Sequence, residues 1–203
     1  IYITTKGPSN QFRMNAEAET SEGLDNYGNS LVGLSVNGPI LRNSKGSSIL
    51  GYRFSGRYTY REDDNPSPIA IIQAQESVLA ELQANPLRQI GDRAVVSADF
   101  LTNDDVNVLQ TRPFEESDRL NLNGKIDARL SDAIDVSLSG FYGSSNNQFT
   151  PGENGTGSWQ LLNAARNPTQ ESQNYRGNFR VRHRLGGSGV ADGGTGNRSV
   201  IQN

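Results

Sequence analysis

The sequence predicts an all-β protein, and more specifically part of an antiparallel transmembrane β-barrel with long loops on one side. Several segments of about ten residues alternate regularly between apolar and polar side chains, and two of them are joined by a three-residue turn. Only 33% of the residues are hydrophobic, which is low for a chain that must fill its own core. A barrel wall reconciles these observations because one face meets lipid and the other meets water.

The clearest two-faced segment spans residues 48–61. Aromatic residues occupy one parity and arginines alternate with them on the other, so the two sets lie on opposite faces of a strand. On a soluble sheet, the same aromatic residues would be suited to stack on sugars. For a barrel strand, the predicted lipid-facing residues are Tyr52, Phe54, Tyr58 and Tyr60, and the predicted lumen-lining residues are Arg53, Arg57 and Arg61.

A predicted hairpin follows the same rule. Residues 119–130 and 134–143 each alternate, and the turn between them contains only Ser131, Asp132 and Ala133. Strands of about ten residues match the length that crosses a bilayer at a tilt. The lipid-facing residues expected here are Leu120, Leu122, Ile126, Val136 and Leu138.

Residues 175–185 predict another strand of this kind, with Phe179 and Val181 facing lipid and His183 near the membrane interface. The other parity carries Arg176, Arg180 and Arg182. All six predicted lumen arginines leave two interpretations open: they line a path for an acidic or sugar-like solute, or they pair with carboxylates inside the barrel.

Two further strands are expected at 11–20 and 30–37, the latter ended by Gly38-Pro39. Long loops are expected at about 62–117 and 144–174, both on the same side of the wall. The first loop should contain a helix at 73–85 and a strand at 93–101, and the second one or two helical turns at 159–166. A glycine-rich segment covers 186–197.

Composition excludes several classes of function. The chain has no cysteine and one histidine, so it offers no thiolate nucleophile, cysteine-ligated metal or multi-histidine site. No catalytic constellation is present, and we expect no enzyme activity, no cofactor and no metal. Acidic segments at 62–65 and 103–105 contain oxygen ligands of the kind calcium takes, although solvated acidic loops are commoner. A net charge of −3 argues against a nucleic-acid partner.

Three short motifs give the chain a family resemblance. Ile3-Thr4-Thr5-Lys6-Gly7 looks like the end of a plug domain, Asn37-Gly38-Pro39-Ile40 like a periplasmic strand end, and Tyr58–Asp64 like an aromatic strand entering an acidic loop. Together they resemble the TonB-dependent receptors of the outer membrane, most closely the large type found in Bacteroidota.

The resemblance implies a division of the chain. Residues 1–8 would end the plug, and residues 9–203 would form the N-terminal part of the barrel, about six to seven strands of the roughly 22 in a plug-filled barrel. The chain begins at Ile1 as if inside a strand and stops at Asn203 as another begins, so we expect a piece of a longer protein.

The resemblance also implies location, activity and partners. The protein would lie in the bacterial outer membrane and import a bulky solute, such as a glycan, peptide or metal chelate. Its partners would be outer-membrane lipids, the rest of its own barrel and plug, a TonB-type motor complex and, as a further candidate, a surface lipoprotein. Two alternatives stay open: a barrel of the same family that serves as a structural or assembly subunit, and a soluble β-rich glycan-binding surface domain.

Overall fold

The computed structural model describes residues 8–151 and 156–184. The predicted strand at 1–5, the plug-like motif at 3–7 and the segment after Arg184 lie outside these residues. One six-stranded antiparallel sheet dominates the structure, which confirms the predicted antiparallel, mostly β architecture. Its strands are β1 (Arg13–Thr20), β2 (Ser30–Arg42), β3 (Ser48–Arg61), β8 (Ser117–Arg129), β9 (Ile134–Gln148) and β10 (Thr169–His183).

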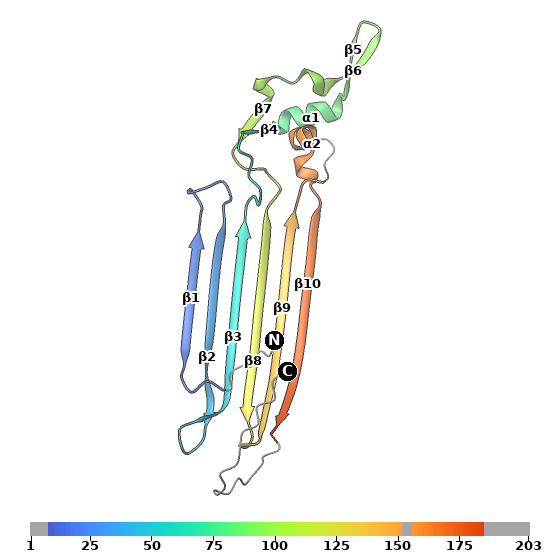
Figure 1. Cartoon of the computed structure of the whole chain (residues 1–203). Helices are drawn as coiled ribbons and strands as arrows, with labels where there is room; N and C mark the ends of the chain where they lie inside the picture. The colour runs from blue at the N-terminus through green and yellow to red at the C-terminus, as the bar shows by residue number, and fades with distance from the viewer. Residues whose placement is uncertain (1–7, 152–155, 185–203) are drawn as a thin grey trace, which may run out of the picture.

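The sheet is an open meander. Its strand order is β1-β2-β3-β8-β9-β10, so each strand pairs with the next large strand along the chain (Figure 1). Within the described residues, β1 and β10 are the edges. A simple up-and-down order of this kind needs no crossover connection.

The connections differ sharply between the two ends of the sheet (Figure 1). At one end, β2–β3 and β8–β9 are joined by short turns, and the second turn is closed by the Leu130 amide donating to the Ile134 carbonyl at 3.0 Å. At the other end lie the connections 21–29, 62–116 and 149–168. The two longest loops therefore share one side, as the sequence predicts.

The predicted loop at 144–174 is too long. β9 continues to Gln148 and β10 already begins at Thr169, because residues 144–147 pair with both neighbouring strands and Gln148 pairs with Thr169. Serine, asparagine and glutamine occupy this extension on both faces. The extension has no apolar–polar alternation, which is why the sequence pattern did not reveal it.

Two other strand boundaries also differ from the prediction. β2 does not end before Gly38-Pro39 but continues to Arg42, with irregular register between Pro39 and Arg42. Proline lacks an amide donor and is tolerated in a strand at such an irregularity. At the other strand, β1 begins at Arg13 rather than at residue 11.

The 62–116 loop contains its own small elements. β4 (Ile71–Ala74) pairs with β7 (Val106–Leu109), and β5 (Leu87–Ile90) pairs with β6 (Arg93–Val96). Helix α1 covers Glu76–Ala84, so the first residues of the predicted helix at 73–85 belong to β4 and its exit. The predicted strand at 93–101 is split into β6 and the short 3₁₀ helix Ser97–Phe100.

The 149–168 loop forms α2 (Thr156–Asn163) and a 3₁₀ turn (Ala164–Arg166), which confirms the predicted helical turns. Helix α2 contacts β4, so the two large loops fold together as a cap above the sheet (Figure 1). Most of the buried apolar side chains of the described residues lie in this cap: Ile71, Ala74 and Ala164. No helix among the described residues is long and apolar enough to span a membrane.

Candidate functional site

All eleven predicted lipid-facing residues lie on one face of the sheet. Residues directly opposite each other in paired strands share a face. Tyr52 opposes Ile126, Ile126 opposes Leu138, and Leu138 opposes Phe179, so one row of apolar side chains crosses four strands. The remaining members of the set keep the same parity: Phe54, Tyr58, Tyr60, Leu120, Leu122, Val136 and Val181.

This apolar face continues to the β1 edge of the sheet. Val36 of β2 lies opposite Phe54, and Met14 of β1 lies opposite Val36. Many of its side chains are open to the surroundings; Phe179, for example, is 68% exposed. No described element covers the face. A contiguous exposed apolar surface of this width is rare on soluble monomers and indicates an apolar partner.

The opposite face is polar and predominantly basic. The six predicted lumen arginines all lie on it. Arg57 pairs with Glu17 at 2.8 Å, whereas the other five form no ion pair with any described residue. On this face the six strands carry ten basic residues (Arg13, Arg53, Arg57, Arg61, Arg119, Lys125, Arg129, Arg176, Arg180 and Arg182) and four acidic ones (Glu17, Glu19, Asp127 and Asp135).

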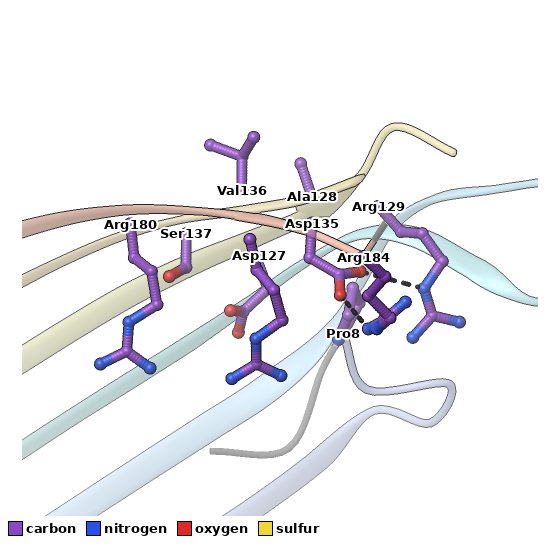
Figure 2. Close-up of a pocket in the computed structure, with 10 residues that line it drawn as sticks. Pro8, Asp127, Ala128, Arg129, Asp135, Val136, Ser137, Arg180 and Arg184 are labelled. Carbon is purple, nitrogen blue, oxygen red and sulfur yellow. Dashed lines mark hydrogen bonds and ion pairs between the residues drawn. The ribbon is translucent and has the colours of Figure 1, made fainter. Parts of the chain in front are cut away.

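A hollow at the short-turn end shows the division between the faces (Figure 2). Asp135 accepts from Arg129 at 3.4 Å and also pairs with Arg184. These side chains point to the polar side, while Val136 points to the opposite side (Figure 2). The alternation inferred from the sequence is therefore seen directly in the side chains.

Pro8 and Ser9, which precede β1, lie on the polar side of this end. Pro8 lines the hollow and lies against Gly51, where a side-chain Cβ would come within 3.1 Å of the Pro8 Cβ. Ser9 Oγ accepts from Asn37 Nδ2 at 3.1 Å, and Asn10 Oδ1 accepts from the Ser48 amide at 2.7 Å. The chain thus enters the sheet from its polar face.

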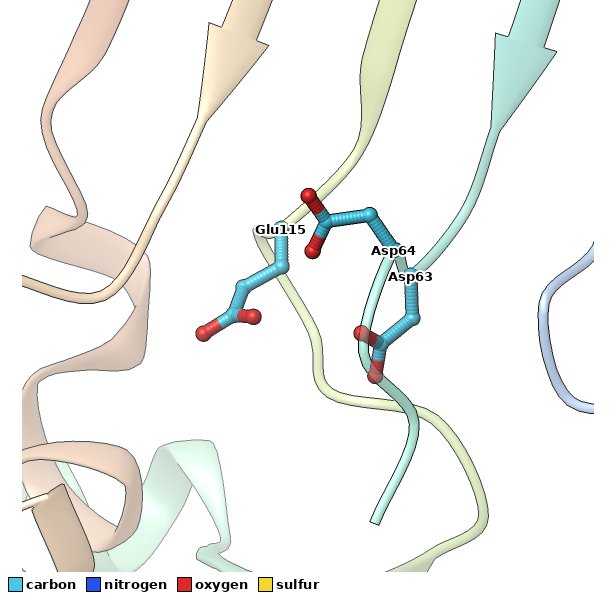
Figure 3. Close-up of side chains that lie close together, drawn as sticks. All are labelled: Asp63, Asp64 and Glu115. Carbon is cyan, nitrogen blue, oxygen red and sulfur yellow. The ribbon is translucent and has the colours of Figure 1, made fainter.

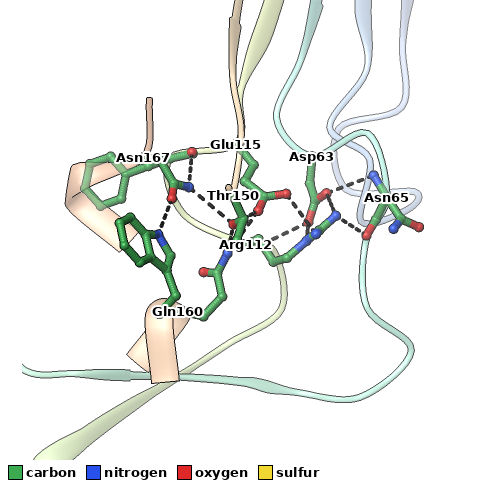
Figure 4. A network of polar contacts seen from close by, with 9 residues as sticks. Asp63, Asn65, Arg112, Glu115, Thr150, Gln160 and Asn167 are labelled. Atoms are coloured by element: carbon green, nitrogen blue, oxygen red, sulfur yellow. Dashed lines mark hydrogen bonds and ion pairs between the residues drawn. The ribbon is translucent and has the colours of Figure 1, made fainter. Parts of the chain in front are cut away.

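Arg112 is the centre of a second polar arrangement, in the cap (Figure 4). Its Nη2 donates to Asp63 Oδ1 at 2.9 Å and its Nε donates to Oδ2 at 3.2 Å, a two-pronged contact with a fully buried carboxylate. Its Nη1 pairs with Glu115 Oε2 at 2.9 Å. Arg112 therefore joins the end of β3 to the segment that leads into β8.

The network extends from Glu115 into the second loop (Figure 4). Gln160 Nε2 donates to Glu115 Oε1 at 2.9 Å, and Thr150 donates to the same carboxylate. Asn167 accepts from Trp159 Nε1 at 2.7 Å and donates to the Phe114 carbonyl at 2.7 Å. We call this set the cap network: Asp63, Asn65, Arg112, Glu115, Thr150, Trp159, Gln160 and Asn167.

The charges of the cap network are stabilised mutually. Burial alone raises the pKa of Asp63, but the hydrogen bonds from Arg112 and from the Asn65 amide outweigh it and hold this pKa below its usual value of 3.8. Burial lowers the pKa of Arg112, yet Asp63 and Glu115 raise it above its usual value. Both partners of the Asp63–Arg112 pair are therefore charged at neutral pH.

Asp63, Asp64 and Glu115 also bring carboxylate oxygens within 4.8 Å of one another (Figure 3). Two of the three carboxylates already bind Arg112, which compensates their charge. The predicted alternatives for segment 62–65, calcium ligands or a solvated acidic loop, both fail for Asp63, since it is buried against a guanidinium. We assign no metal to this cluster.

Two features escaped the sequence analysis. Hydrogen bonds of the cap network link residues up to 53 positions apart, and its only local signal in the sequence is a loop-like Thr111-Arg112-Pro113. The second feature is Phe141, an aromatic residue at a polar-face position of β9, visible in the sequence as a break in the alternation.

No protein-family model, no curated protein and no solved structure matches this chain.

Proposed function

We propose that the chain is part of the wall of a transmembrane β-barrel in the bacterial outer membrane, within a TonB-dependent transporter. The observation that carries the proposal is the continuous apolar face over six strands, backed by a polar face on which five of the six predicted lumen arginines form no ion pair with a described residue. A bilayer on one side and a water-filled lumen on the other satisfy both faces at once.

The dimensions support a bilayer as the apolar partner. On β3, the apolar set runs from Leu50 to Tyr60. Ten residue steps at about 3.3 Å each span roughly 33 Å along the strand, and a tilt of about 40° reduces this to roughly 25 Å, the height of the apolar band in barrels. The polar ends of β9 and β10 extend beyond this band, toward the long loops, as barrel strands do.

The open edges support a larger closed assembly. β10 has 15 residues and is exposed along its whole length, and its outer row of backbone donors and acceptors has no partner among the described residues. A membrane wall cannot leave such an edge in lipid, so further strands must pair with β1 and β10. Six strands are too few to enclose a lumen, which fits the larger family barrel.

Import is the activity that we propose for the complete protein. The N-terminal entry of the chain at the polar face, through Pro8, supports a plug inside the barrel. The basic lumen face supports passage of a solute that arginine recognises. The partners proposed with it are outer-membrane lipids, the remaining barrel and plug, a TonB-type motor and a surface lipoprotein at the cap.

Membrane insertion is the test of this proposal. The protein should remain in the membrane fraction after alkaline carbonate extraction and should migrate differently on gels before and after boiling, as folded barrels do. A soluble, monomeric protein that unfolds cooperatively without detergent contradicts the barrel. An inserted protein whose solute uptake does not respond to removal of the inner-membrane proton gradient contradicts the transport role and leaves the structural-subunit alternative.

A further inference from the structure

Phe141 is the exception to the two-faced rule of the sheet. It is the only aromatic side chain on the polar face of the six described strands, while the remaining aromatic residues of these strands share the apolar face. The ring is half-buried, although no apolar core lies on this side. An aromatic ring in a water-facing wall calls for a reason other than packing into a core.

The neighbours of Phe141 are hydrogen-bonding and basic groups. Asn123 lies directly opposite on β8, and Arg176 lies directly opposite on β10. Directly opposed positions are about 5 Å apart, and diagonal positions about 7–8 Å. The diagonal positions carry Asn121, Lys125, Asn174 and Asn178.

The absence of a side chain at Gly143 leaves room for the Phe141 ring. A Cβ at Gly143 would lie 2.9 Å from Phe141 Cζ and 3.1 Å from Cε1, so the ring leans along β9 into the room that this glycine leaves. A ring in this orientation lies along the sheet and presents a flat surface on which a ligand can stack. Phe141 lines both a hollow of about 330 Å³ and another of about 230 Å³.

The chemistry around the ring selects the ligand. Sugar rings pack their C–H groups on aromatic faces, and asparagine amides offer the paired donors and acceptors that hydroxyl groups need. Arg53, Lys125 and Arg176 line the larger hollow, and no acidic residue lines either one. Arg53 and Arg176 form no ion pair with a described residue, so they are available to a carboxylate.

We infer that Phe141 is the stacking platform of a binding site for an acidic oligosaccharide on the polar face, with the surrounding asparagines and Arg176 as its hydrogen-bonding partners. The inference rests on the proposed function, because it names the solute class of that lumen. A neutral sugar would leave Arg53 and Arg176 without a carboxylate partner. An acidic peptide would not use the aromatic ring or the surrounding asparagine amides.

The test compares three probes by isothermal titration calorimetry with the detergent-solubilised protein: trigalacturonate, maltotriose and triglutamate. We expect trigalacturonate to bind most tightly. Phe141→Ala should lower its affinity by about tenfold or more, the order expected for one lost stacking contact. Phe141→Trp should preserve binding, because indole is a larger platform.

Two further variants separate a binding role from a folding role. Gly143→Ala places a methyl group against the ring and keeps every proposed ligand-binding side chain, so it should weaken binding while the heat-dependent gel mobility stays that of the wild type. Tyr142→Ala removes the adjacent aromatic from the opposite face and should leave binding unchanged.

The inference is overturned if maltotriose or triglutamate binds as tightly as trigalacturonate, if no probe binds, or if trigalacturonate binds Phe141→Ala as it binds the wild type. These results leave the barrel proposal standing when the protein still inserts into membranes. If the protein does not insert into membranes but still binds trigalacturonate, only the barrel proposal is contradicted.

Discussion

Arg112 and Asp63 lie 49 positions apart in the chain and form a two-pronged ion pair, with N–O distances of 2.9 and 3.2 Å, that seals the junction between the large loop and the sheet. Asp63 is fully buried, whereas Arg112 keeps 20% of its side chain exposed. The pair lies where β3 and β8 leave the sheet, so it fixes both ends of the excursion 62–116.

Arg112→Leu should loosen the cap while the sheet persists. It leaves the carboxylates of Asp63 and Glu115 buried without their cation, which typically costs about 3–5 kcal/mol. Hydrogen exchange should show faster exchange of backbone amides in 62–116 and 149–168 and unchanged exchange in β8 and β9. The matched control is Arg57→Ala, which removes a half-exposed pair with Glu17 and should cost less than about 1 kcal/mol. Equal effects of the two substitutions would refute this role of Arg112.

The cap should also respond to acid through Asp63. Its pKa in the folded protein is below 3.8, so its ionised form stabilises the cap above that pH, and this contribution is lost as pH falls through the lowered pKa. Limited proteolysis with an acid-active protease should leave the cap intact at pH 5 and should cleave it once the pH falls below 3.8, toward the lowered pKa of Asp63. In Asp63→Asn this dependence on pH should be weaker. A variant with the wild-type profile would assign the acid response to other groups.

Charge on the two faces should have unequal consequences. Leu122→Arg places a cation in the middle of the apolar band, where such substitutions cost about 2–4 kcal/mol in barrels. Asn123→Arg, one residue further along on the polar face, should be tolerated. Folding yield in lipid vesicles measures both, and equal yields would be incompatible with a lipid-facing Leu122.

Trp159 offers a direct optical view of the cap. It is the only tryptophan of the chain, and its Nε1 donates to Asn167 Oδ1 at 2.7 Å. Asn167→Ala removes that acceptor and the contact with the Phe114 carbonyl, whose residue has a φ of 59° in the left-handed region. The emission of Trp159 should shift to longer wavelength as water reaches the indole. An unchanged spectrum would show that the bond does not shelter the ring.

The alternation of side chains allowed much of the sheet to be predicted from the sequence. The eleven residues predicted to face lipid share one face of the sheet and the six predicted lumen arginines share the other, because a period of two decides which residues share a face without knowledge of the partners. Strand ends were less predictable. Ser144–Gln148 extends β9 through backbone pairing alone, and such polar extensions leave no pattern in the sequence.

The cap network was beyond the reach of sequence reasoning for a different reason. Arg112, Glu115 and Gln160 meet through contacts between two loops, and each looks like an ordinary surface residue in its own segment. Phe141, by contrast, was visible as a break in the alternation of β9. The sequence shows an aromatic residue at a polar-face position, but only the structure shows which residues of β8 and β10 lie beside it.

Site-directed spin labelling along β8 would show whether the sheet separates lipid from water, because the chain contains no cysteine and every introduced thiol is unique. Single cysteines at 120 through 126 would be labelled in lipid vesicles, and their collisions with oxygen and with a water-soluble nickel chelate would be measured. We expect a period of two, with oxygen favoured at Leu120, Leu122 and Ile126 and the nickel chelate at Asn121, Asn123 and Lys125. Equal access of the nickel chelate to both sets would contradict a wall between lipid and water.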